Sequence, residues 1–424
     1  MSAENNVPAI RFQGFDGEWD ERCLGEIGSL KNGMNFDKTA MGHGHPFVNL
    51  QDVFGKNEVS NNNLGLAFST VNQRKEYSLN QGDVLFIRSS VKPEGVGEAA
   101  VISKSLENTT YSGFIIRFRP NVEMDVNFNR FVYSTANSRR QILASSTSSA
   151  NSNINQDSLQ RIQLALPSKE EQNKVGNYFQ QLDTLIAQHQ KKHDKLLNLK
   201  KSLLEKMLPK QGAIVPEIRF KGVSGKWEEK ALQSIVEVLD GDRGHNYPNG
   251  DDLQTTGHTL FLSASNVTAN GFKLGVTQYI SEEKSNCLGN GKLVLNDIIL
   301  TSRGSVGHIA WYNEHIEQQV AFVRINSGML ILRSKNHIAP SIIAQFLKSP
   351  AGKKKIDLIS FGSAQPQLTK MSVSAYTVTI PSEKTEQTKI GNLFDQLDTL
   401  ITQHQTQLKK LNNIKQACLE KMFV

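Results

Sequence analysis

Residues 171–207 read EQNKVGNYFQQLDTLIAQHQKKHDKLLNLKKSLLEKM, and residues 386–422 read EQTKIGNLFDQLDTLITQHQTQLKKLNNIKQACLEKM. At a constant offset of 215, 23 of the 37 paired positions are identical. A match of this length within one chain indicates an internal duplication. The two copies divide the chain into similar halves, and the fold is organised around them.

Both copies carry apolar residues at alternating steps of three and four, which places those residues along one side of a helix. In the first copy the seam includes Val175, Phe179, Leu182, Ile186, Leu196, Leu203 and Met207. At about 1.5 Å per residue, each copy predicts a helix of roughly 55 to 65 Å. One helix cannot bury a stripe of this length, so we expect the two helices to pack on each other.

Composition describes an ordinary globular chain of 424 residues, long enough for more than one domain. The sequence contains no run of about eighteen apolar residues and no signal peptide at its start, so we expect a cytoplasmic protein without a membrane span. Cys23, Cys287 and Cys418 lie too far apart for a disulfide framework or a zinc site. The net charge of +7 permits a polyanionic partner without requiring one.

The duplication extends beyond the helices. VPAIRF at residues 7–12 and VPEIRF at residues 215–220 open the two halves. Between these signatures and the helices the sequences diverge, yet Asp83 and Asp297 each follow a turn residue and precede an apolar strand. We therefore predict an α/β (α+β) fold with two pseudo-symmetric mixed α/β globular domains. Their predicted bounds, with the helical segments that follow them, are 1–166, 167–210, 211–380 and 381–424.

Enzyme motifs are missing from the sequence. It has no GxxxxGK[ST] loop, no Asn/Asp-Pro-Pro-aromatic tetrapeptide, no G-x-S-x-G and no HExxH. His189 and His193 stand four residues apart, as helical metal ligands can, but both fall on the apolar seam and are better explained as register-setting polar residues. We predict neither a catalytic site nor a metal site.

Polar loops precede both helices, SSANSNI at residues 148–154 and GSAQPQL at residues 362–368. Each presents two amide side chains two residues apart. One interpretation is a surface turn with helix-capping residues. The other is bidentate hydrogen bonding to adenine edges, for which amides are suited. Basic residues in loops after apolar strands, Arg88, Lys92 and Arg303, similarly suit either phosphate contacts or a generic surface.

The combination strongly resembles the specificity subunit of type I restriction–modification systems. The residues that carry the resemblance are Pro167-Ser168, Glu171-Gln172, Phe179, Leu182-Asp183 and Ile186, with their repeats Pro381-Ser382, Glu386-Gln387, Phe394, Leu397-Asp398 and Ile401. Because it spans both halves, the resemblance covers essentially the whole chain. Asn296 departs from the glycine that the family usually has before the central strand.

The resemblance implies two target recognition domains, each contacting one half of a split sequence in double-stranded DNA. It implies that the helices form an antiparallel coiled coil that spaces the halves and docks two modification subunits. S-adenosylmethionine, ATP and Mg would be used by those subunits and by restriction/translocase subunits, with no cofactor and no catalysis in this chain. A stand-alone DNA-binding protein and a protein-binding coiled-coil scaffold remain as alternative hypotheses.

Individual residues follow from this hypothesis. The candidates for DNA binding are Arg88, Lys92, Asn151 and Asn153 in the first globule, and Arg303, Gln365, Gln367 and Lys370 in the second. The candidates for binding partner subunits are Gln172, Asp183, Gln387 and Asp398 on the helices.

Overall fold

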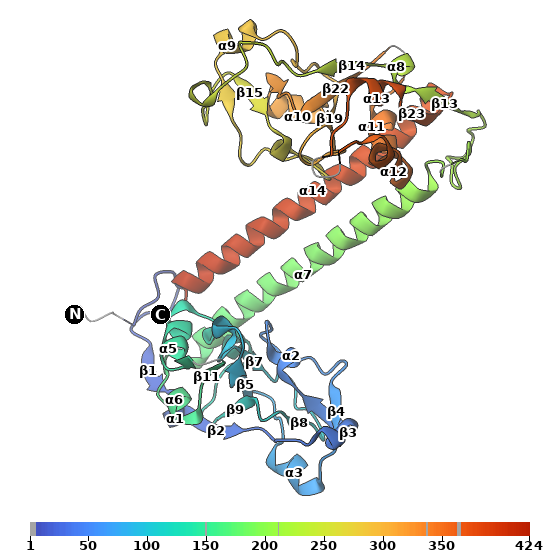
Figure 1. The fold of residues 1–424 in the computed structure, drawn as a ribbon. Helices are drawn as coiled ribbons and strands as arrows, with labels where there is room; N and C mark the ends of the chain where they lie inside the picture. Colours follow the sequence, from blue (N-terminus) through green and yellow to red (C-terminus); the bar gives the residue numbers. More distant parts are fainter. Residues whose placement is uncertain (1–5, 149–150, 211, 336–337, 363–365) are drawn as a thin grey trace. The chain divides into compact units, whose positions relative to one another are not determined.

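The computed structural model describes residues 6–148, 151–210, 212–335, 338–362 and 366–424. The chain divides into two compact units, shown in Figure 1. Unit 1 comprises Met1–Gln190 and Thr406–Val424, and unit 2 comprises Lys191–Gln405. Each unit takes in part of both long helices, so this division differs from the four consecutive segments predicted from the sequence.

The centre of unit 1 is a four-stranded antiparallel sheet in the order β2-β9-β5-β7. These strands are β2 (Gly28–Asn32), β9 (Ile115–Pro120), β5 (Val84–Ile87) and β7 (Ala99–Val101). Strand β5 is apolar at every position because both faces of the sheet are covered. Phe86 packs into a core shared with α4 (Val126–Val132) and the long helices, whereas Leu85 and Ile87 pack into a smaller core on the opposite face.

Three smaller sheets surround this centre in the order β4-β3-β8, β1-β12 and β10-β11-β6. Their strands are β4 (Gly65–Ala67), β3 (Met41–Val48), β8 (Thr110–Tyr111), β1 (Asp20–Cys23), β12 (Gln163–Leu166), β10 (Thr147–Ser148), β11 (Ser152–Asn153) and β6 (Ser89–Ser90). The remaining helices of unit 1 are α1 (Leu24–Ile27), α2 (Leu50–Val53), α3 (Val71–Glu76), α5 (Ala136–Ala144) and α6 (Gln156–Gln160), with 3-10 turns η1 (Lys38–Ala40) and η2 (Pro93–Gly95).

Unit 2 repeats this plan. Its four-stranded antiparallel sheet has the order β14-β22-β19-β20, and its three-stranded sheet β18-β15-β21 has the same mixture of one antiparallel and one parallel pair as β4-β3-β8. Its strands are β13 (Trp227–Ala231), β14 (Val236–Asp240), β15 (Thr259–Leu262), β16 (Val267–Thr268), β17 (Gly271–Phe272), β18 (Tyr279–Ile280), β19 (Ile298–Thr301), β20 (Ile309–Trp311), β21 (Val323–Ile325), β22 (Met329–Ser334) and β23 (Thr377–Pro381). Its helices are α8 (Leu232–Ile235), α9 (Glu282–Cys287), α10 (Glu314–Gln319), α11 (Pro340–Lys348), α12 (Pro350–Ile359) and α13 (Lys370–Ala375), with 3-10 turns η3 (Gly250–Asp252) and η4 (Ala264–Asn266). The prediction of two repeated mixed α/β domains is therefore confirmed.

The turn before the central strand is built identically in the two units. Gly82 and Asn296 both have a positive φ, 88° and 75° respectively, a conformation that glycine adopts freely and asparagine tolerates. The aspartate that follows is buried and accepts a bidentate pair of hydrogen bonds, Asp83 from Arg119 at 2.7 and 2.6 Å. Asp297 accepts the corresponding pair from Arg333 at 2.9 and 2.8 Å. Asparagine at position 296 thus preserves the backbone that the buried ion pair requires.

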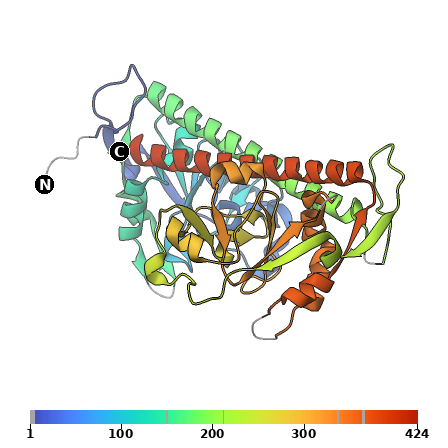
Figure 2. The same cartoon turned by 90° about the horizontal axis from the view of Figure 1, so that it is seen from above.

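The long helices are α7 (Lys169–Lys206) and α14 (Lys384–Lys421). In unit 1 the start of α7 lies beside the end of α14, where Lys415 Nζ donates to Asp183 at 2.6 Å (Figures 1 and 2). In unit 2 the end of α7 lies beside the start of α14, where Lys200 Nζ donates to Asp398. The two contacts pair opposite ends of the helices, so the helices are antiparallel, as predicted.

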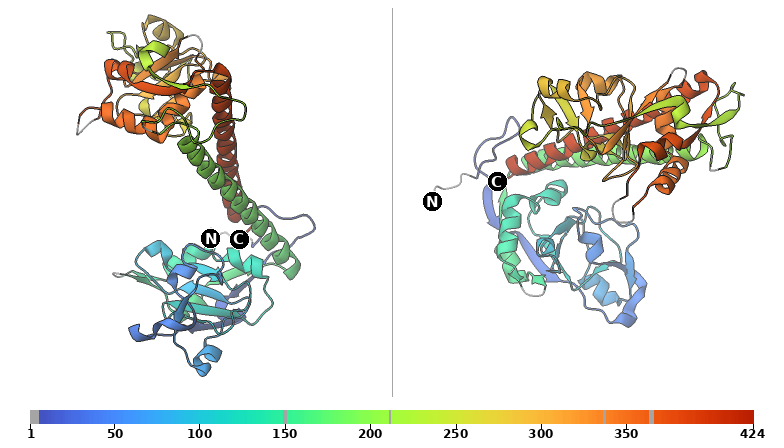
Figure 3. Two further views of the ribbon diagram at one scale, coloured as in Figure 1. Left: turned by 90° about the vertical axis from the view of Figure 1, so that its right-hand side faces the viewer. Right: turned by 45° about the horizontal axis from the view of Figure 1, so that its top comes forward.

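The end of each helix completes the core of the globule that belongs to the other half of the sequence. In unit 1, at the C-terminus shown in Figure 3, Phe423 is 6% exposed, and its ring centroid lies 5.3 Å from Phe128 and 5.6 Å from Phe179. In unit 2, Met207 and Leu208 are buried in the corresponding core. The signature segments bind the same helix ends, with Ile10 N–H donating to Lys421 O at 2.8 Å and Ile218 N–H to Lys206 O at 2.9 Å.

We expect Phe423→Ala to destabilise unit 1 by about 3 to 5 kcal/mol, since it removes a buried ring from an aromatic cluster. Hydrogen exchange of the full chain should show lost protection in β5 and β9 and unchanged protection in β19 and β22. Leu208→Ala is the matched variant in unit 2 and should give the reverse pattern. Uniform loss of protection across both units in either variant would contradict this assignment of the helix ends.

Candidate nucleic-acid interface

Arg88 is fixed between two other chain segments at the end of β5. Its backbone N–H donates to Phe114 O at 2.8 Å, its carbonyl accepts from Ile154 N–H at 2.9 Å, and its Nη1 lies 3.3 Å from Gly113 O. In the adjoining small sheet, Asn153 of β11 pairs with β6, the strand that follows Arg88. The structure therefore brings together a cation and an amide that are more than sixty residues apart in the sequence.

The other two predicted residues of unit 1 belong to the same loop cluster. Lys92 is exposed two residues after β6, and its backbone N–H donates to Ser90 Oγ at 3.1 Å. Asn151 is exposed, and its carbonyl accepts from Asn153 Nδ2 at 2.9 Å. We call Arg88, Lys92, Asn151 and Asn153 reader surface 1.

Unit 2 assembles a comparable surface from the loops after β19 and α12. Arg303 is exposed, and the residue before it, Ser302, accepts a backbone hydrogen bond from Leu368 at 2.9 Å. Gln367 is paired with Phe361 through two backbone hydrogen bonds of 2.9 and 3.0 Å. Lys370 is exposed at the start of α13. We call Arg303, Gln367 and Lys370 reader surface 2, and Gln365 lies outside the described residues.

The two predicted arginines do not occupy the same structural position. The hydrogen bond from residue 154 to residue 88 corresponds to that from 368 to 302, so Arg88 matches Ser302, and Arg303 matches Ser89. Successive residues of an extended segment point to opposite sides. Arg88 is half-buried while Arg303 is exposed, so the two units present their cations differently on a shared frame.

Gln172 and Gln387, predicted to bind partner subunits, are instead committed inside their own units. Gln172 is 4% exposed, and its amide donates to Pro167 O at 3.0 Å and accepts from Asp125 N–H at 3.0 Å. Gln387 is 1% exposed and makes the corresponding bonds to Pro381 O and from Ala339 N–H, at 2.8 and 3.0 Å. Buried amides with both ends satisfied hold each helix start to its globule, so we drop them as docking residues.

The neighbouring glutamates have a role that sequence reasoning missed. Glu171 and Glu386 are buried, and each accepts a bidentate pair from the arginine of a signature segment. Arg11 donates to Glu171 at 2.7 and 2.8 Å, and Arg219 donates to Glu386 at 2.8 and 2.6 Å. The hydrogen bonds to these carboxylates raise the pKa of both guanidinium groups. The sequence did contain a signal for this ion pair, because the signature segment with its arginine and the Glu-Gln pair at the helix start each occur in both halves.

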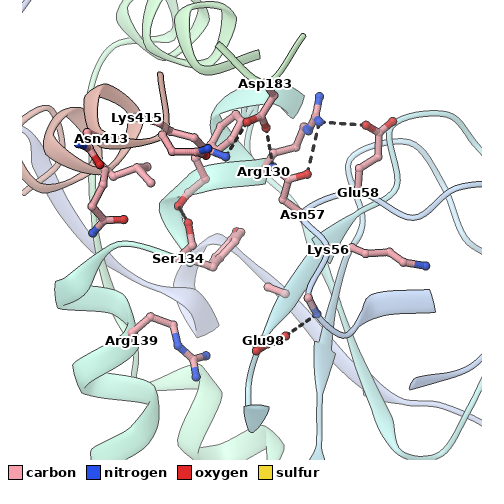
Figure 4. A pocket seen from close by; sticks show the side chains of 17 residues that line it. Lys56, Asn57, Glu58, Glu98, Arg130, Ser134, Arg139, Asp183, Asn413 and Lys415 are labelled. Atoms are coloured by element: carbon pink, nitrogen blue, oxygen red, sulfur yellow. Dashed lines mark hydrogen bonds and ion pairs between the residues drawn. The ribbon is translucent and has the colours of Figure 1, made fainter. Parts of the chain in front are cut away.

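Asp183 and Asp398 are only partly accessible because they link the two helices. Asp183 accepts from Lys415 and from Asn57 Nδ2 at 3.1 Å, at the wall of a polar cleft of about 1100 Å³ within unit 1 (Figure 4). Arg130, which lines the same cleft, pairs with Glu58 at 3.1 Å. Asp398 accepts from Lys200 and lies 3.7 Å from Lys348 Nζ. Both aspartates therefore serve primarily as interhelical partners.

A third set of helix residues is both exposed and identical in the two copies. Identity at buried seam positions follows from packing, but packing gives no reason for identity at exposed ones. Near the start of each helix these pairs include Lys174/Lys389, Asn177/Asn392, Gln181/Gln396, Thr184/Thr399, Leu185/Leu400 and Gln188/Gln403. Each member lies three or four residues from another member of its set, which places the set on one outward stripe of its helix. We call these sets the repeated stripes.

Near Asp398, burial shifts the pKa values of two further groups, Lys348 and Asp395. Burial lowers the pKa of the Lys348 ammonium, and burial together with the Asp398 charge raises the pKa of the Asp395 carboxyl. Asp395 also accepts from Asn313 Nδ2 at 3.2 Å. The residue equivalent to Asp395 in unit 1 is the neutral Gln180.

Asp395→Asn should leave unit 2 at least as stable as the unmodified chain at pH 7.5, with a smaller advantage at pH 4.5. A carboxyl whose folded pKa is raised stabilises the fold while protonated and loses that contribution as pH rises through the folded pKa. Urea unfolding at the two pH values measures the difference, and Gln180→Asn in unit 1 is the uncharged control. An advantage that is larger at pH 4.5 would refute the assigned sign.

Among the described residues, no group of three or more His, Cys, Asp or Glu is placed to hold a metal ion. Within the same part of the chain, no helix has the length and apolar content needed to cross a membrane.

The chain is similar to known specificity proteins along nearly all of its length. The model of the family "Type I restriction modification DNA specificity domain" matches residues 16–198 and again residues 224–413. No curated protein matches the sequence.

Solved structures show the same likeness. The S subunit of a type I restriction–modification system from M. genitalium aligns over 99% of both chains with a TM-score of 0.61 and 16% identity, which supports a shared fold. A structure described in terms of complex assembly and conformational transition of the type I R-M system aligns over 95% of this chain and 97% of its own, with a TM-score of 0.49 and 15% identity. The HsdS subunit from Thermoanaerobacter tengcongensis aligns over 96% of both chains, with a TM-score of 0.42 and 15% identity.

Proposed function

This chain belongs to the family of type I restriction modification DNA specificity domains, of which it carries two copies, and we propose that each copy contacts one half of a two-part DNA target. The observation that carries the proposal is the pair of reader surfaces. In each unit, loops that are distant in sequence meet at the end of the central strand and present a cation beside amide groups. Because the two surfaces differ in sequence on one shared frame, we expect the two half-sites to differ.

The side chains of each surface divide between base contacts and backbone contacts. Arginine pairs with guanine O6 and N7, and asparagine or glutamine with adenine N6 and N7, in the major groove. We assign these base contacts to Arg88, Asn151 and Asn153 in unit 1 and to Arg303 and Gln367 in unit 2. Lys92 and Lys370 are exposed beside them and suit phosphate contacts, which position a protein without selecting sequence. Gln365 is retained as a further amide candidate of the second surface.

We assign no catalysis to this chain. In this proposal it acts in the cytoplasm with modification subunits that use S-adenosylmethionine to methylate adenine and with restriction/translocase subunits that use ATP and Mg. The paired helices would set the length of the unread gap between the half-sites. A 38-residue helix is about 57 Å long, and its antiparallel partner stiffens it.

The repeated stripes supply the docking sites for two modification subunits. Six exposed positions carry the same residue at the same spacing on both helices, whereas the reader surfaces have diverged. Two copies of one partner require two copies of one binding surface, and a repeated stripe satisfies that requirement. Leu185 and Leu400, 43% and 42% exposed, are apolar groups at equivalent points of the two stripes. They replace the buried Gln172 and Gln387 as candidate docking residues.

Arg303→Ala should reduce discrimination between the target and a single-base mismatch in one half-site about tenfold or more, in keeping with 1 to 3 kcal/mol for a bidentate base contact. Binding of the assembled complex to mismatched duplexes at fixed salt measures the ratio. Arg88→Ala is the matched variant and should affect the other half-site. An equal loss of affinity for every duplex would identify the side chain as a phosphate contact instead.

Leu185→Arg and Leu400→Arg should each remove one modification subunit, and the double variant should remove both, because a charge at the stripe must be desolvated on docking. Native mass spectrometry of the co-expressed complex counts the subunits. Leu199→Arg changes another exposed leucine on the same helix, at a position that is isoleucine in the other copy, and serves as the control. Retention of both subunits in the double variant would overturn this docking assignment.

A further inference from the structure

An exposed aromatic ring lies directly beside the arginine of reader surface 1. Phe114 is 58% exposed, and the pairing of Ile87 with Ile115 continues by one rung to place Arg88 opposite Phe114. The hydrogen bond of 2.8 Å from Arg88 N–H to Phe114 O confirms that rung. Side chains directly opposite each other on antiparallel strands lie on the same face, with Cβ atoms about 5 Å apart.

Reader surface 2 has the same combination, built from a different position. Phe361 is 54% exposed and forms a reciprocal backbone pair with Gln367. At the position that matches Phe114, unit 2 has Gly328, whose carbonyl accepts from Ser302 N–H at 2.8 Å. Each unit therefore has an exposed phenylalanine beside a side chain suited to base contacts, although the two phenylalanines occupy different positions of the shared fold.

Exposure of these rings is unfavourable unless a partner covers them. A phenylalanine that stays in water forgoes about 1.5 to 3 kcal/mol of burial free energy. Arg88 stands opposite Phe114, and Lys92 belongs to the same loop cluster, so an anionic surface with an apolar group near its charge complements this part of unit 1. DNA meets this description, because the thymine methyl group lies in the major groove beside the donors and acceptors that arginine and amides contact.

We propose, on the basis of the function proposed above, that Phe114 and Phe361 are specificity-determining residues that each pack on a thymine methyl group. Phe114 contacts a thymine next to the base paired with Arg88, and Phe361 contacts a thymine next to the base paired with Gln367. Each half-site is then selected by an apolar contact in addition to the polar base contacts assigned above.

The test uses the chain assembled with its modification subunits. The DNA is a set of duplexes that carry the sequence this complex methylates. Each thymine of the target is replaced in turn by deoxyuracil, which keeps the base pairing and deletes only the methyl group. At one position in each half-site, deoxyuracil should weaken binding of the unmodified complex about fourfold, corresponding to one lost methyl contact. Salt is held constant because phosphate contacts dominate the absolute affinity.

Phe114→Ala should bind the thymine and deoxyuracil duplexes equally at its own half-site, while keeping the fourfold ratio at the other. Phe361→Ala should give the mirror result, so each variant controls for the other. Both rings are more than half exposed, and the thermal transition of each variant should match that of the unmodified chain.

The outcomes separate this inference from the function on which it rests. In one outcome the unmodified complex binds sequence-specifically, but Phe114→Ala lowers the affinity for the thymine duplex and for the deoxyuracil duplex by the same factor. The methyl contact is then refuted and the proposed function stands. If the unmodified complex shows no preference between target and mismatched duplexes, the proposed function itself fails. If the ratio of thymine to deoxyuracil affinity falls from four to one in each alanine variant, and only at its expected half-site, the result supports both the methyl contact and the proposed function.

Discussion

The structure depends on the exchange of helix ends between two halves of one sequence. A single globule lacks part of its own core: the aromatic cluster around Trp19 and Phe128 is closed by Phe423, which lies nearly three hundred residues after Phe128. The bidentate pair between Arg11 and Glu171 then ties the signature segment to the start of the adjacent helix. Because both halves make these contacts reciprocally, neither globule can be described without the helix of the other.

This reciprocity separates what must stay constant from what can vary. The buried carboxylates before the central strands and at the helix starts recur in both units with nearly the same distances. Removing one partner of such a pair would leave an uncompensated buried charge, which costs several kcal/mol. The loops that follow the central strands carry no such requirement. They can accept arginine, serine, phenylalanine or glycine at corresponding positions while the frame beneath them is retained.

Much of the fold was predictable because the duplication marks it twice. The long antiparallel helices and two mixed α/β globules followed from the repeated seam, the repeated signature and the resemblance that they support. The compact units were not predictable from segment order, since they depend on which helix end enters which core. The internal hydrogen bonds of Gln172 and Gln387 were not predictable, because their partners lie in other segments of the chain.

The structure brings predicted loop residues together, and their role in DNA binding stays a prediction. Arg88 and Asn153 were identified from strand ends and paired amides, and the structure brings them together. Phe114 escaped notice because an isolated phenylalanine before an apolar strand is expected to be buried, and only its measured exposure shows otherwise. The one-residue offset between Arg88 and Arg303 likewise requires hydrogen-bond register, which sequence alignment of two divergent loops does not supply.

The burial of Phe423 also constrains the order of events during synthesis. Ordinarily an N-terminal domain folds while the remainder of the chain is still being made, at about 5 to 20 residues per second. Here the first globule must wait for Phe423, which leaves the ribosome roughly 10 to 40 s after the first long helix is complete. During that interval its open core is a target for chaperones, and a chain that lacks the end of α14 leaves its earliest domain unfinished.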